Sequence, residues 1–286
     1  MQLKRWLRNF SELVVFEHTL FSLPFIFTAM VVAAGGWFGW TLLGLGLLAA
    51  VSARNFAMGF NRLVDRRYDA LNPRTASRPS VDGRLSVRAM TLFVAANALL
   101  FVAVSYLINA LAFKLALPFL VILGAYSLIK RFSASAHLFL GLALALAPIA
   151  GVVAVLGAVP LWSIALAVGV LFWVAGFDLL YALQDEAFDR QLGLHSIPAR
   201  FGQGGTFVIA RLFHLIAFGA WLLFCHLADL GLLALIGVAI CGAMLIAEHK
   251  IAAQGMEHIN RAFFTVNGYL GVIFFIFIVG DQLWRM

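Results

Sequence analysis

The chain has 286 residues, of which 63% are hydrophobic and only 12% are charged, and its formal net charge is +7. Soluble domains have about 45–50% apolar and about 25% charged residues, so this composition excludes a soluble globular protein. In a membrane protein the location of the basic residues matters more than their sum, so the positive charge does not indicate a nucleic-acid partner.

Nine apolar segments follow one another along the chain, separated by polar breaks or by breaks that contain Gly or Pro. Each is close to the length of about 20 residues that an α-helix needs to cross a bilayer. In chain order they cover residues 13–34, 38–62, 87–107, 110–130, 136–157, 161–185, 206–226, 229–247 and 263–283. We therefore expect an all-α integral membrane protein with nine transmembrane helices, folded as a single transmembrane domain over residues 1–286.

The N-terminal stretch and the two cysteines bear on two other interpretations. MQLKRWLRNFSELVVFEHTL is basic but lacks a small-residue cleavage site, so we interpret it as the interfacial start of the first span and not as a removable signal. Cys225 and Cys241 fall inside apolar segments. We expect them to be small buried residues, with neither a disulfide framework nor a metal site.

The distribution of basic residues predicts the orientation, because cytoplasmic loops carry an excess of Lys and Arg. With the N-terminus in the cytoplasm and the C-terminus on the outer side, most of the 20 Lys and Arg fall on the inner side. The exceptions are Lys114 and Arg285 near the outer face and Arg54 within the second span. An eight- or ten-span layout would scatter these charges over both faces. We expect cytoplasmic cap loops at about 63–86 and 186–205, and a functional site at the cytoplasmic face of the inner membrane.

Acidic residues recur at four-residue spacing where the second and sixth predicted helices end. NRLVDRRYDALNPRTASRP contains Asn61, Asp65 and Asp69, and LQDEAFDRQLGLHSIPARFG contains Asp185 and Asp189. Helix positions four apart share one face about 6 Å apart along the axis, so each motif would present a ladder of hard oxygen ligands. Mg²⁺ prefers a few carboxylates together with water and substrate phosphate oxygens. One motif alone would equally suit solvated ion pairs, but two facing ladders could hold two ions with a diphosphate between them.

Basic and phenolic residues lie near these acids. Arg74 and Arg78 belong to the proline-restricted loop NPRTASRP, and a guanidinium binds phosphate bidentately. Tyr126 and Lys130 lie one turn apart at the end of the fourth helix, in YSLIKR. A lysine there could be only a snorkelling anchor, but its position on the same side as both motifs favours a functional role. We interpret Arg62, Arg66 and Arg67 as markers of the cytoplasmic face.

Ionisable groups inside a membrane span are costly and usually functional. Arg54 precedes Asn61 by seven residues, and Asp178 precedes Asp185 by seven, so each lies two turns inward from its motif on the same face. An ion pair between Arg54 and Asp178 could hold the bundle together. Alternatively, Arg54 could hold an acidic acceptor, and Asp178 could orient or deprotonate it.

Three stretches of the chain resemble the UbiA superfamily of intramembrane aromatic prenyltransferases: NRLVDRRYDALNPRTASRP, YSLIKR and DLLYALQDEAFDRQLGLHSIPARFG. The resemblance covers essentially the whole chain, and nine helices in the expected orientation agree with it. FEHTLFSLPF, SARNFAMGFNRLVDRRYDA and YALQDEAFDRQLGLHSIPARFG are similar to the 4-hydroxybenzoate polyprenyltransferase branch. They are especially similar to its MqnP-type members from menaquinone-making bacteria, which are linked to the futalosine route.

The resemblance implies Mg²⁺-dependent transfer of a polyprenyl group from polyprenyl diphosphate to a ring carbon of a hydroxylated aromatic acid, in ubiquinone or menaquinone biosynthesis. It also assigns the metal–diphosphate ligands, Asn61, Asp65, Asp69, Asp185 and Asp189. Diphosphate contacts or braces of the cap loops would come from Arg74, Arg78, Tyr126 and Lys130. His195 stands where many relatives have Lys, so here an imidazole takes the place of a lysine contact to the leaving group. Asp178 is the candidate acid on the acceptor side.

This chemistry suits a membrane enzyme. A metal ion neutralises the charge that develops on the departing diphosphate, and the resulting allylic cation needs a dry pocket. Burial of a prenyl tail contributes roughly 0.8 kcal/mol per CH₂, so the donor stays in the membrane lipid. We expect the tail to leave sideways between helices.

Other functions fit the sequence less well. Secondary transporters bind near the bilayer midplane at broken helices, whereas the acids here cluster at inner helix ends. A purely structural membrane subunit would not need two acid motifs. Within the superfamily, the acceptor could also be a glycerol-lipid hydroxyl, haem, a chlorophyllide or homogentisate. Pocket shape decides between 4-hydroxybenzoate and a dihydroxynaphthoate, so both stay open at this stage, as do the donor chain length, the oligomeric state and the catalytic base.

Overall fold

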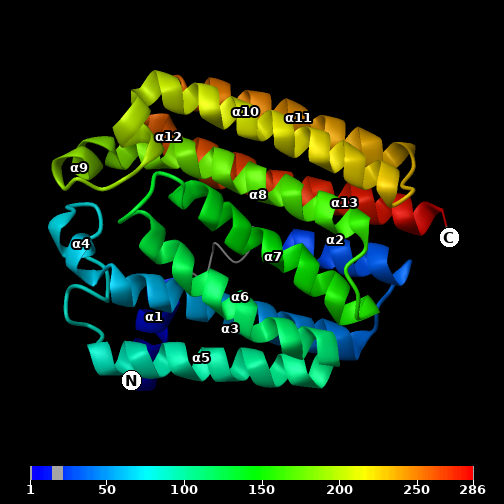
Figure 1. Cartoon of the computed structure of the whole chain (residues 1–286), viewed down its shortest axis with the longest axis horizontal. Helices are drawn as coiled ribbons and strands as arrows, with labels where there is room; N and C mark the ends of the chain where they lie inside the picture. The colour runs from blue at the N-terminus through cyan, green and yellow to red at the C-terminus, as the bar shows by residue number, and fades with distance from the viewer. Residues whose placement is uncertain (1, 15–21, 286) are drawn as a thin grey trace. The chain divides into compact units, whose positions relative to one another are not determined.

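The computed structural model describes residues 2–14 and 22–285, and side chains are described from residue 8 onward within these ranges, except at 261. Over these ranges the secondary structure is helical, with short 3₁₀ and π segments and no strand (Figure 1). The helices form two compact units. The first contains Met1–Thr19 and Leu43–Leu128, and the second contains Leu20–Leu42 and Ile129–Met286.

The first unit is built mainly from three long helices and two shorter ones. They are α1 (Gln2–Val14), α3 (Trp40–Val64), α4 (Arg66–Leu71), α5 (Val87–Ile108) and α6 (Ala110–Ile129). Phe10 and Leu13 of α1 are buried against Leu85 and Met90 in a small hydrophobic cluster. Between α3 and α5, Asn55 Nδ2 donates a hydrogen bond of 3.1 Å to an amide oxygen on the facing helix. A hydrogen bond of this kind inside a span helps to fix which helix faces pack together.

The second unit contains the remaining helices. They are α2 (Leu23–Ala34), α7 (Ala136–Leu156), α8 (Leu161–Ala182), α9 (Glu186–Gln191), α10 (Ile197–Leu227), α11 (Leu232–Ala252), α12 (Ile259–Arg261) and α13 (Asn267–Trp284). Short segments join some of them: η2 (Leu183–Asp185), η3 (Met256–His258) and the π segment η4 (Ala262–Val266). In the core, α8 packs against both α7 and α10. Buried aromatic rings fill the space between them; the centroids of Phe25 and Trp173 are 5.0 Å apart, and those of Trp221 and Phe274 are 5.1 Å apart.

Two glycines of the second unit have specific structural roles. A Cβ on Gly141 would lie 2.3 Å from the backbone oxygen of Leu171, so the backbones of α7 and α8 approach more closely than any side chain would allow. Gly202 has φ 67° and ψ −175° inside α10, a conformation that glycine adopts without steric penalty. It separates the first turn of α10, which Ser196 caps by accepting a hydrogen bond from Ala199 N, from the long membrane part.

The predicted class, an all-α membrane protein, is confirmed. In the described part of the chain, eight helices are long and apolar enough to cross a membrane, and α2 is a shorter apolar helix. The predicted first span, 13–34, includes residues 15–21, which together with most of the FEHTLFSLPF stretch lie outside the described residues. The count of nine spans and the orientation stay predictions. Cys225 and Cys241 are free and buried, as expected.

Candidate active site

Both acidic motifs lie at the junction of a long helix and a six-residue helix, so the expectation of one unbroken helical ladder needs correction. Asp65, between α3 and α4, has φ −91° and ψ 2°. Asp185, ahead of α9, has φ −102° and ψ 3°. A ψ near 0° departs from the helical value of about −42° and falls in the sparsely allowed region where many active-site residues occur. Each second carboxylate is therefore carried on a short helix of its own.

In the first unit, the acids of the motif are bound within the motif and its loop. Asn61 Nδ2 donates to Asp65 Oδ2 at 2.9 Å. Arg78 Nη1 donates to Asp69 Oδ1 at 2.6 Å, and Asp69 is only 8% exposed. Asp69 Oδ2 is buried and accepts no hydrogen bond from any described residue. A buried carboxylate oxygen without a donor is costly unless a cation or ligand binds it, so Asp69 fits a metal ligand.

The loop after α4 is held by its own polar contacts in addition to its prolines. Thr75 Oγ1 donates to the backbone oxygen of Asp69 at 2.8 Å, and Arg66 Nε donates to the backbone oxygen of Ser80 at 2.7 Å. Arg84 Nη1 lies 2.6 Å from Glu12 Oε2 of α1, and this hydrogen bond, with another to Asp82, raises the pKa of Arg84. Arg74 is exposed, and its backbone N–H bonds Asn72 Oδ1. The predicted cap loop is thus a defined structure anchored on α1.

Two further cations of the first unit lie near the motif. Arg62 is 8% exposed, and its Nη1 donates to Asn61 Oδ1 at 3.2 Å. The interpretation of Arg62 as a mere marker of the cytoplasmic face is therefore incomplete, because its head group braces a candidate ligand. Tyr126 of α6 lies close to both Arg54 and Arg62. The structure thus brings Arg54 and Tyr126, two predicted site residues, into one neighbourhood.

In the second unit, Asp189 is fully buried beside a lysine. Lys130 Nζ lies 2.7 Å from Asp189 Oδ1, and the lysine side chain keeps 35% of its surface exposed. Asp189 Oδ2 is buried and accepts no hydrogen bond within the described chain. His195 N donates to the backbone oxygen of Lys130 at 3.0 Å, and Leu194 N donates to that of Asp189 at 2.9 Å, so the loop after α9 holds the pair together. The imidazole of His195 is exposed.

Asp178 has a partner that the sequence did not indicate. His137 Nδ1 lies 2.7 Å from Asp178 Oδ2, which joins the start of α7 to α8. His137 was not predicted, because a single histidine at the start of an apolar segment forms no pattern. The ion pair between Asp178 and Arg54 that the sequence suggested stays a prediction.

A buried polar network in the core of the second unit was also missed. Trp173 Nε1 donates to Asn267 Oδ1 at 2.7 Å, and Asn267 Nδ2 donates to Glu248 Oε1 at 2.8 Å. Nearby, His214 Nδ1 and His249 Nε2 are 3.0 Å apart. The predicted eighth span stopped at residue 247, which placed Glu248 at the membrane edge; α11 continues to Ala252 and Glu248 is fully buried. The network links α8, α10, α11 and α13.

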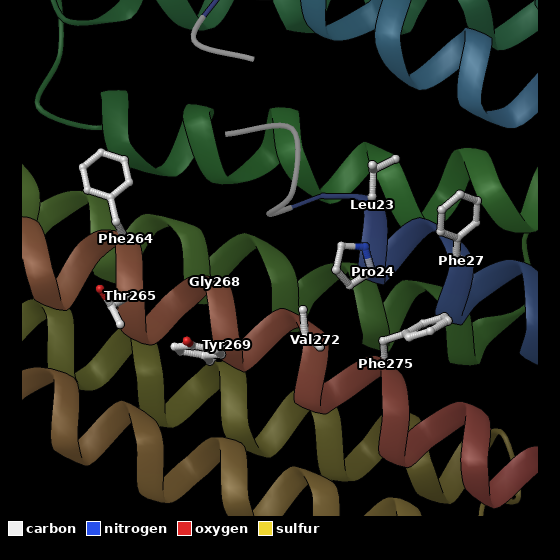
Figure 2. Close-up of a pocket in the computed structure, with 9 residues that line it drawn as sticks. All are labelled: Leu23, Pro24, Phe27, Phe264, Thr265, Gly268, Tyr269, Val272 and Phe275. Atoms are coloured by element: carbon white, nitrogen blue, oxygen red, sulfur yellow. The ribbon is translucent and has the colours of Figure 1, made fainter. Parts of the chain in front are cut away.

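An apolar groove of about 520 Å³ opens between α2 and the helix that includes η4 and α13. Its lining residues are Leu23, Pro24, Phe27, Phe264, Thr265, Gly268, Tyr269, Val272 and Phe275. Figure 2 shows the α2 side chains on one wall and those of η4 and α13 on the other, with Phe27 and Phe275 at the same end. Phe264, Tyr269 and Val272 are exposed, so the groove lies on the surface of this unit.

The donor set fits a hard cation that shares its ligands with a substrate. Within either unit, no three described His, Cys, Asp or Glu side chains gather as a metal cage. Mg²⁺ does not need such a cage, because it is usually bound by one or two carboxylates together with substrate phosphates and water. Asp69 Oδ2 and Asp189 Oδ2, both buried and without a hydrogen-bond donor among the described residues, are suitable ligands for it.

Residues 22–278 match the UbiA prenyltransferase family. The chain is 30% identical over 269 residues to the 4-hydroxybenzoate octaprenyltransferase of Herminiimonas arsenicoxydans, covering 90% of each protein. It is 31% identical over 283 residues to the protein of the same name from Paracidovorax citrulli, covering 98% of this chain and 92% of that relative.

Solved structures show the same fold. The apo structure of a UbiA homolog from Aeropyrum pernix K1 matches with a TM-score of 0.83 and 30% identity, covering 94% of this chain and 98% of that one. A UbiA homolog from Archaeoglobus fulgidus bound to DMAPP and Mg²⁺ matches with a TM-score of 0.72 and 23% identity, covering 95% of this chain and 99% of that one. At 23% identity the second likeness concerns the fold alone.

Proposed function

Because the chain belongs to the UbiA prenyltransferase family and is similar over most of its length to 4-hydroxybenzoate octaprenyltransferases, we propose that it uses Mg²⁺ to transfer a polyprenyl group from polyprenyl diphosphate to a ring carbon of 4-hydroxybenzoate. The observation that carries the proposal is the burial of the second aspartate of each acidic motif, Asp69 and Asp189. Each lies beside a partly exposed cation and keeps one oxygen without a donor among the described residues. The names of the most similar curated relatives support this acceptor.

The residues of each motif would divide the work on the donor. Asn61, Asp65 and Asp69 would bind metal in the first unit, and Asp185 and Asp189 would bind metal in the second. A bound metal ion neutralises charge on the leaving diphosphate. Arg78 and Lys130 each keep an exposed part beside a buried carboxylate, 26% and 35% of the side chain respectively. Each can therefore contact a phosphate oxygen while its carboxylate binds the metal. Arg74, exposed in the cap loop, and His195, exposed after α9, are the further candidates for diphosphate contact.

The tail and the ring of the substrates have different requirements. We assign the groove between α2 and α13 to the polyprenyl tail, because its walls are apolar and part of them is exposed. Arg54, deep in α3, would bind the carboxylate of the acceptor, with Tyr126 beside it. Asp178 would bind the acceptor hydroxyl. The cap loops at about 63–86 and 186–205 carry the positive-inside charge, so the reaction would take place at the cytoplasmic face of the inner membrane, within one domain formed by the whole chain.

A dihydroxynaphthoate-type acceptor is the second candidate. It is favoured by the resemblance of YALQDEAFDRQLGLHSIPARFG, with His195 in place of Lys, to the MqnP-like branch. The two acceptors place the enzyme in ubiquinone or in menaquinone biosynthesis, respectively.

The test is an acceptor screen with the purified protein in liposomes, Mg²⁺ and farnesyl diphosphate. We expect Mg²⁺-dependent diphosphate release and a prenylated product with 4-hydroxybenzoate at a higher kcat/KM than with dihydroxynaphthoates. The opposite preference would support the second candidate. Substrate uptake into the liposomes without diphosphate release would contradict both and favour a transporter.

Variants of the first aspartate of each acidic motif complete the test. Asp65→Ala and Asp185→Ala should each abolish turnover while the protein stays folded. Asp82→Ala is the matched control, because Asp82 is an acid of the same loop as the first motif and its carboxylate bonds the exposed Arg84. Full activity in either motif variant would refute the metal assignment.

A further inference from the structure

The pair of Asp178 and His137 lies two turns inward from Asp185, in a part of α7 and α8 where the proposed function needs a group for the acceptor. His137 Nδ1 is 2.7 Å from Asp178 Oδ2. The imidazole is 6% exposed, whereas the Asp178 side chain is 21% exposed. The carboxylate is therefore the accessible member of the pair, and the imidazole lies buried behind it.

The contacts determine which nitrogen of His137 carries the proton. A carboxylate only accepts hydrogen bonds, so Nδ1 is the donor at this distance. Nε2 is buried and has no hydrogen-bond partner among the described residues. An unpaired buried N–H is unfavourable, so the neutral tautomer with its proton on Nδ1 suits this site better than the imidazolium. The negative charge accordingly stays on Asp178.

We infer that His137 is a positioning residue of the prenyl transfer: it holds Asp178 Oδ2 through its Nδ1–H, so that Oδ1 is presented to the hydroxyl group of the aromatic acceptor. This inference rests on the proposed function. Oδ2 is occupied by His137, which leaves Oδ1 as the oxygen through which the exposed part of the carboxylate reaches a ligand. A carboxylate bound at one oxygen by a buried donor loses the freedom to rotate, as in metal and catalytic sites where an outer partner orients the reacting group.

Asp178 is the temporary acceptor of the hydroxyl proton during the transfer. The C1–O bond of the prenyl diphosphate breaks, and its electron pair leaves with the diphosphate. A ring π pair forms the new C–C bond ortho to the hydroxyl, the O–H pair becomes the C=O of a dienone, and the proton passes to Asp178 Oδ1. The ring carbon then gives its proton to the diphosphate, the C–H pair restores the aromatic ring, and the oxygen takes its proton back from Asp178.

The experiment compares His137→Leu with His137→Asn, because the Asn side-chain amide can take the place of the Nδ1–H donor. With 4-hydroxybenzoate and geranyl diphosphate, we expect His137→Leu to lower kcat about 10- to 100-fold, the range found when an outer-shell partner is removed. His137→Asn should recover most of this loss. Asp178→Asn should be at least as slow as His137→Leu, and the double variant should be no slower than Asp178→Asn alone. Ser163→Ala, which removes a buried hydroxyl that bonds Pro160 O at the other end of α8, is the matched control and should keep full kcat.

A second readout separates positioning from a structural role. Ionisation of the donor can be followed with benzoate as the unreactive acceptor, as positional exchange of ¹⁸O between the bridging and non-bridging oxygens of geranyl diphosphate. Exchange should persist in His137→Leu and disappear in Asp65→Ala. Exchange that is lost together with turnover in His137→Leu, or a His137→Asn variant as slow as His137→Leu, would overturn the inference in favour of a structural role. Unchanged kcat in His137→Leu would overturn it as well. Failure of the proposed function is distinguishable, because the unsubstituted protein would then form no prenylated product.

Discussion

The two acidic motifs share a backbone arrangement but differ in the origin of the cation that accompanies the second carboxylate. In the first unit, Asp69 is paired with Arg78, nine residues later in the same loop. In the second unit, Asp189 is paired with Lys130, which precedes α7 and lies far earlier in the chain. The first motif is thus balanced by its own sequence neighbours. The second is balanced only once Lys130 and α9 have come together.

The two pairs also differ in burial. The Asp69 side chain keeps 11% of its surface exposed, whereas that of Asp189 keeps none. A fully buried carboxylate depends on its partner more than one that water can reach, because an uncompensated charge in a low-dielectric surrounding is strongly unfavourable. In the first site Arg78 can therefore leave Asp69 for a substrate contact at a small free-energy cost. The second site needs Lys130 to stay beside Asp189 until a metal is bound.

The largest expected effect concerns the second carboxylates themselves. Asp69→Asn and Asp189→Asn should each lower kcat/KM on the order of 10²–10³-fold, because each removes a charge that would stabilise the leaving diphosphate through the metal. Both variants should also need more Mg²⁺ for half-maximal activity than the unsubstituted protein, as measured by titration of Mg²⁺ into EDTA-treated protein. If only one variant loses activity, the two motifs are not equivalent in function and the comparison fails.

The next effect concerns the cations. Lys130→Met should lower the stability by about 3 kcal/mol, because it leaves the fully buried Asp189 without its partner. Arg78→Met should lower it by about 1 kcal/mol, since Asp69 can reach water. Thermal unfolding in detergent without Mg²⁺ measures both. Equal losses would show that burial of the carboxylate does not distinguish the two sites.

The smallest effect extends the comparison to the interior of the spans. Asn267→Ala removes the link between Trp173 and Glu248 in the second unit, and we expect a loss of about 1.7 kcal/mol, the upper end for hydrogen bonds between transmembrane helices. Asn97→Ala removes the hydrogen bond with Asn55 in the first unit and should cost about 0.6 kcal/mol, the average for such bonds. Both variants should keep their kcat. A larger loss in Asn97→Ala would reverse the ranking of the two interiors.

The sequence predicted the helices well where polar breaks are clear. The predicted spans 87–107 and 110–130 end within a residue of α5 and α6, because polar residues separate them. The prediction for the seventh span began at residue 206, nine residues after α10 begins, because the glycines around Gly202 read as a break. In the structure Gly202 does interrupt the helical backbone, with φ 67° and ψ −175°, so the turn before it is set apart from the long membrane part.

The residue types of the candidate site were predictable, but their partners were not. Spacing and charge identified Asp65, Asp69, Asp185 and Asp189, and Lys130 was singled out by its place at a helix end. The contacts between Lys130 and Asp189, and between His137 and Asp178, join segments far apart in the chain. A local sequence pattern does not predict such pairs, because they depend on how the helices pack.

The surface groove between α2 and α13 bears on the length of the product. Several of its lining side chains face outward: Tyr269 is 63% exposed and Val272 is 45% exposed. A closed tunnel limits the length of the prenyl tail, because a longer donor cannot fit. A tail that lies in an exposed groove continues into the surrounding lipid, so no wall of this unit limits its length. The number of isoprene units in the quinone would then be decided by the enzyme that makes the diphosphate, and geranyl, farnesyl and longer donors should serve alike.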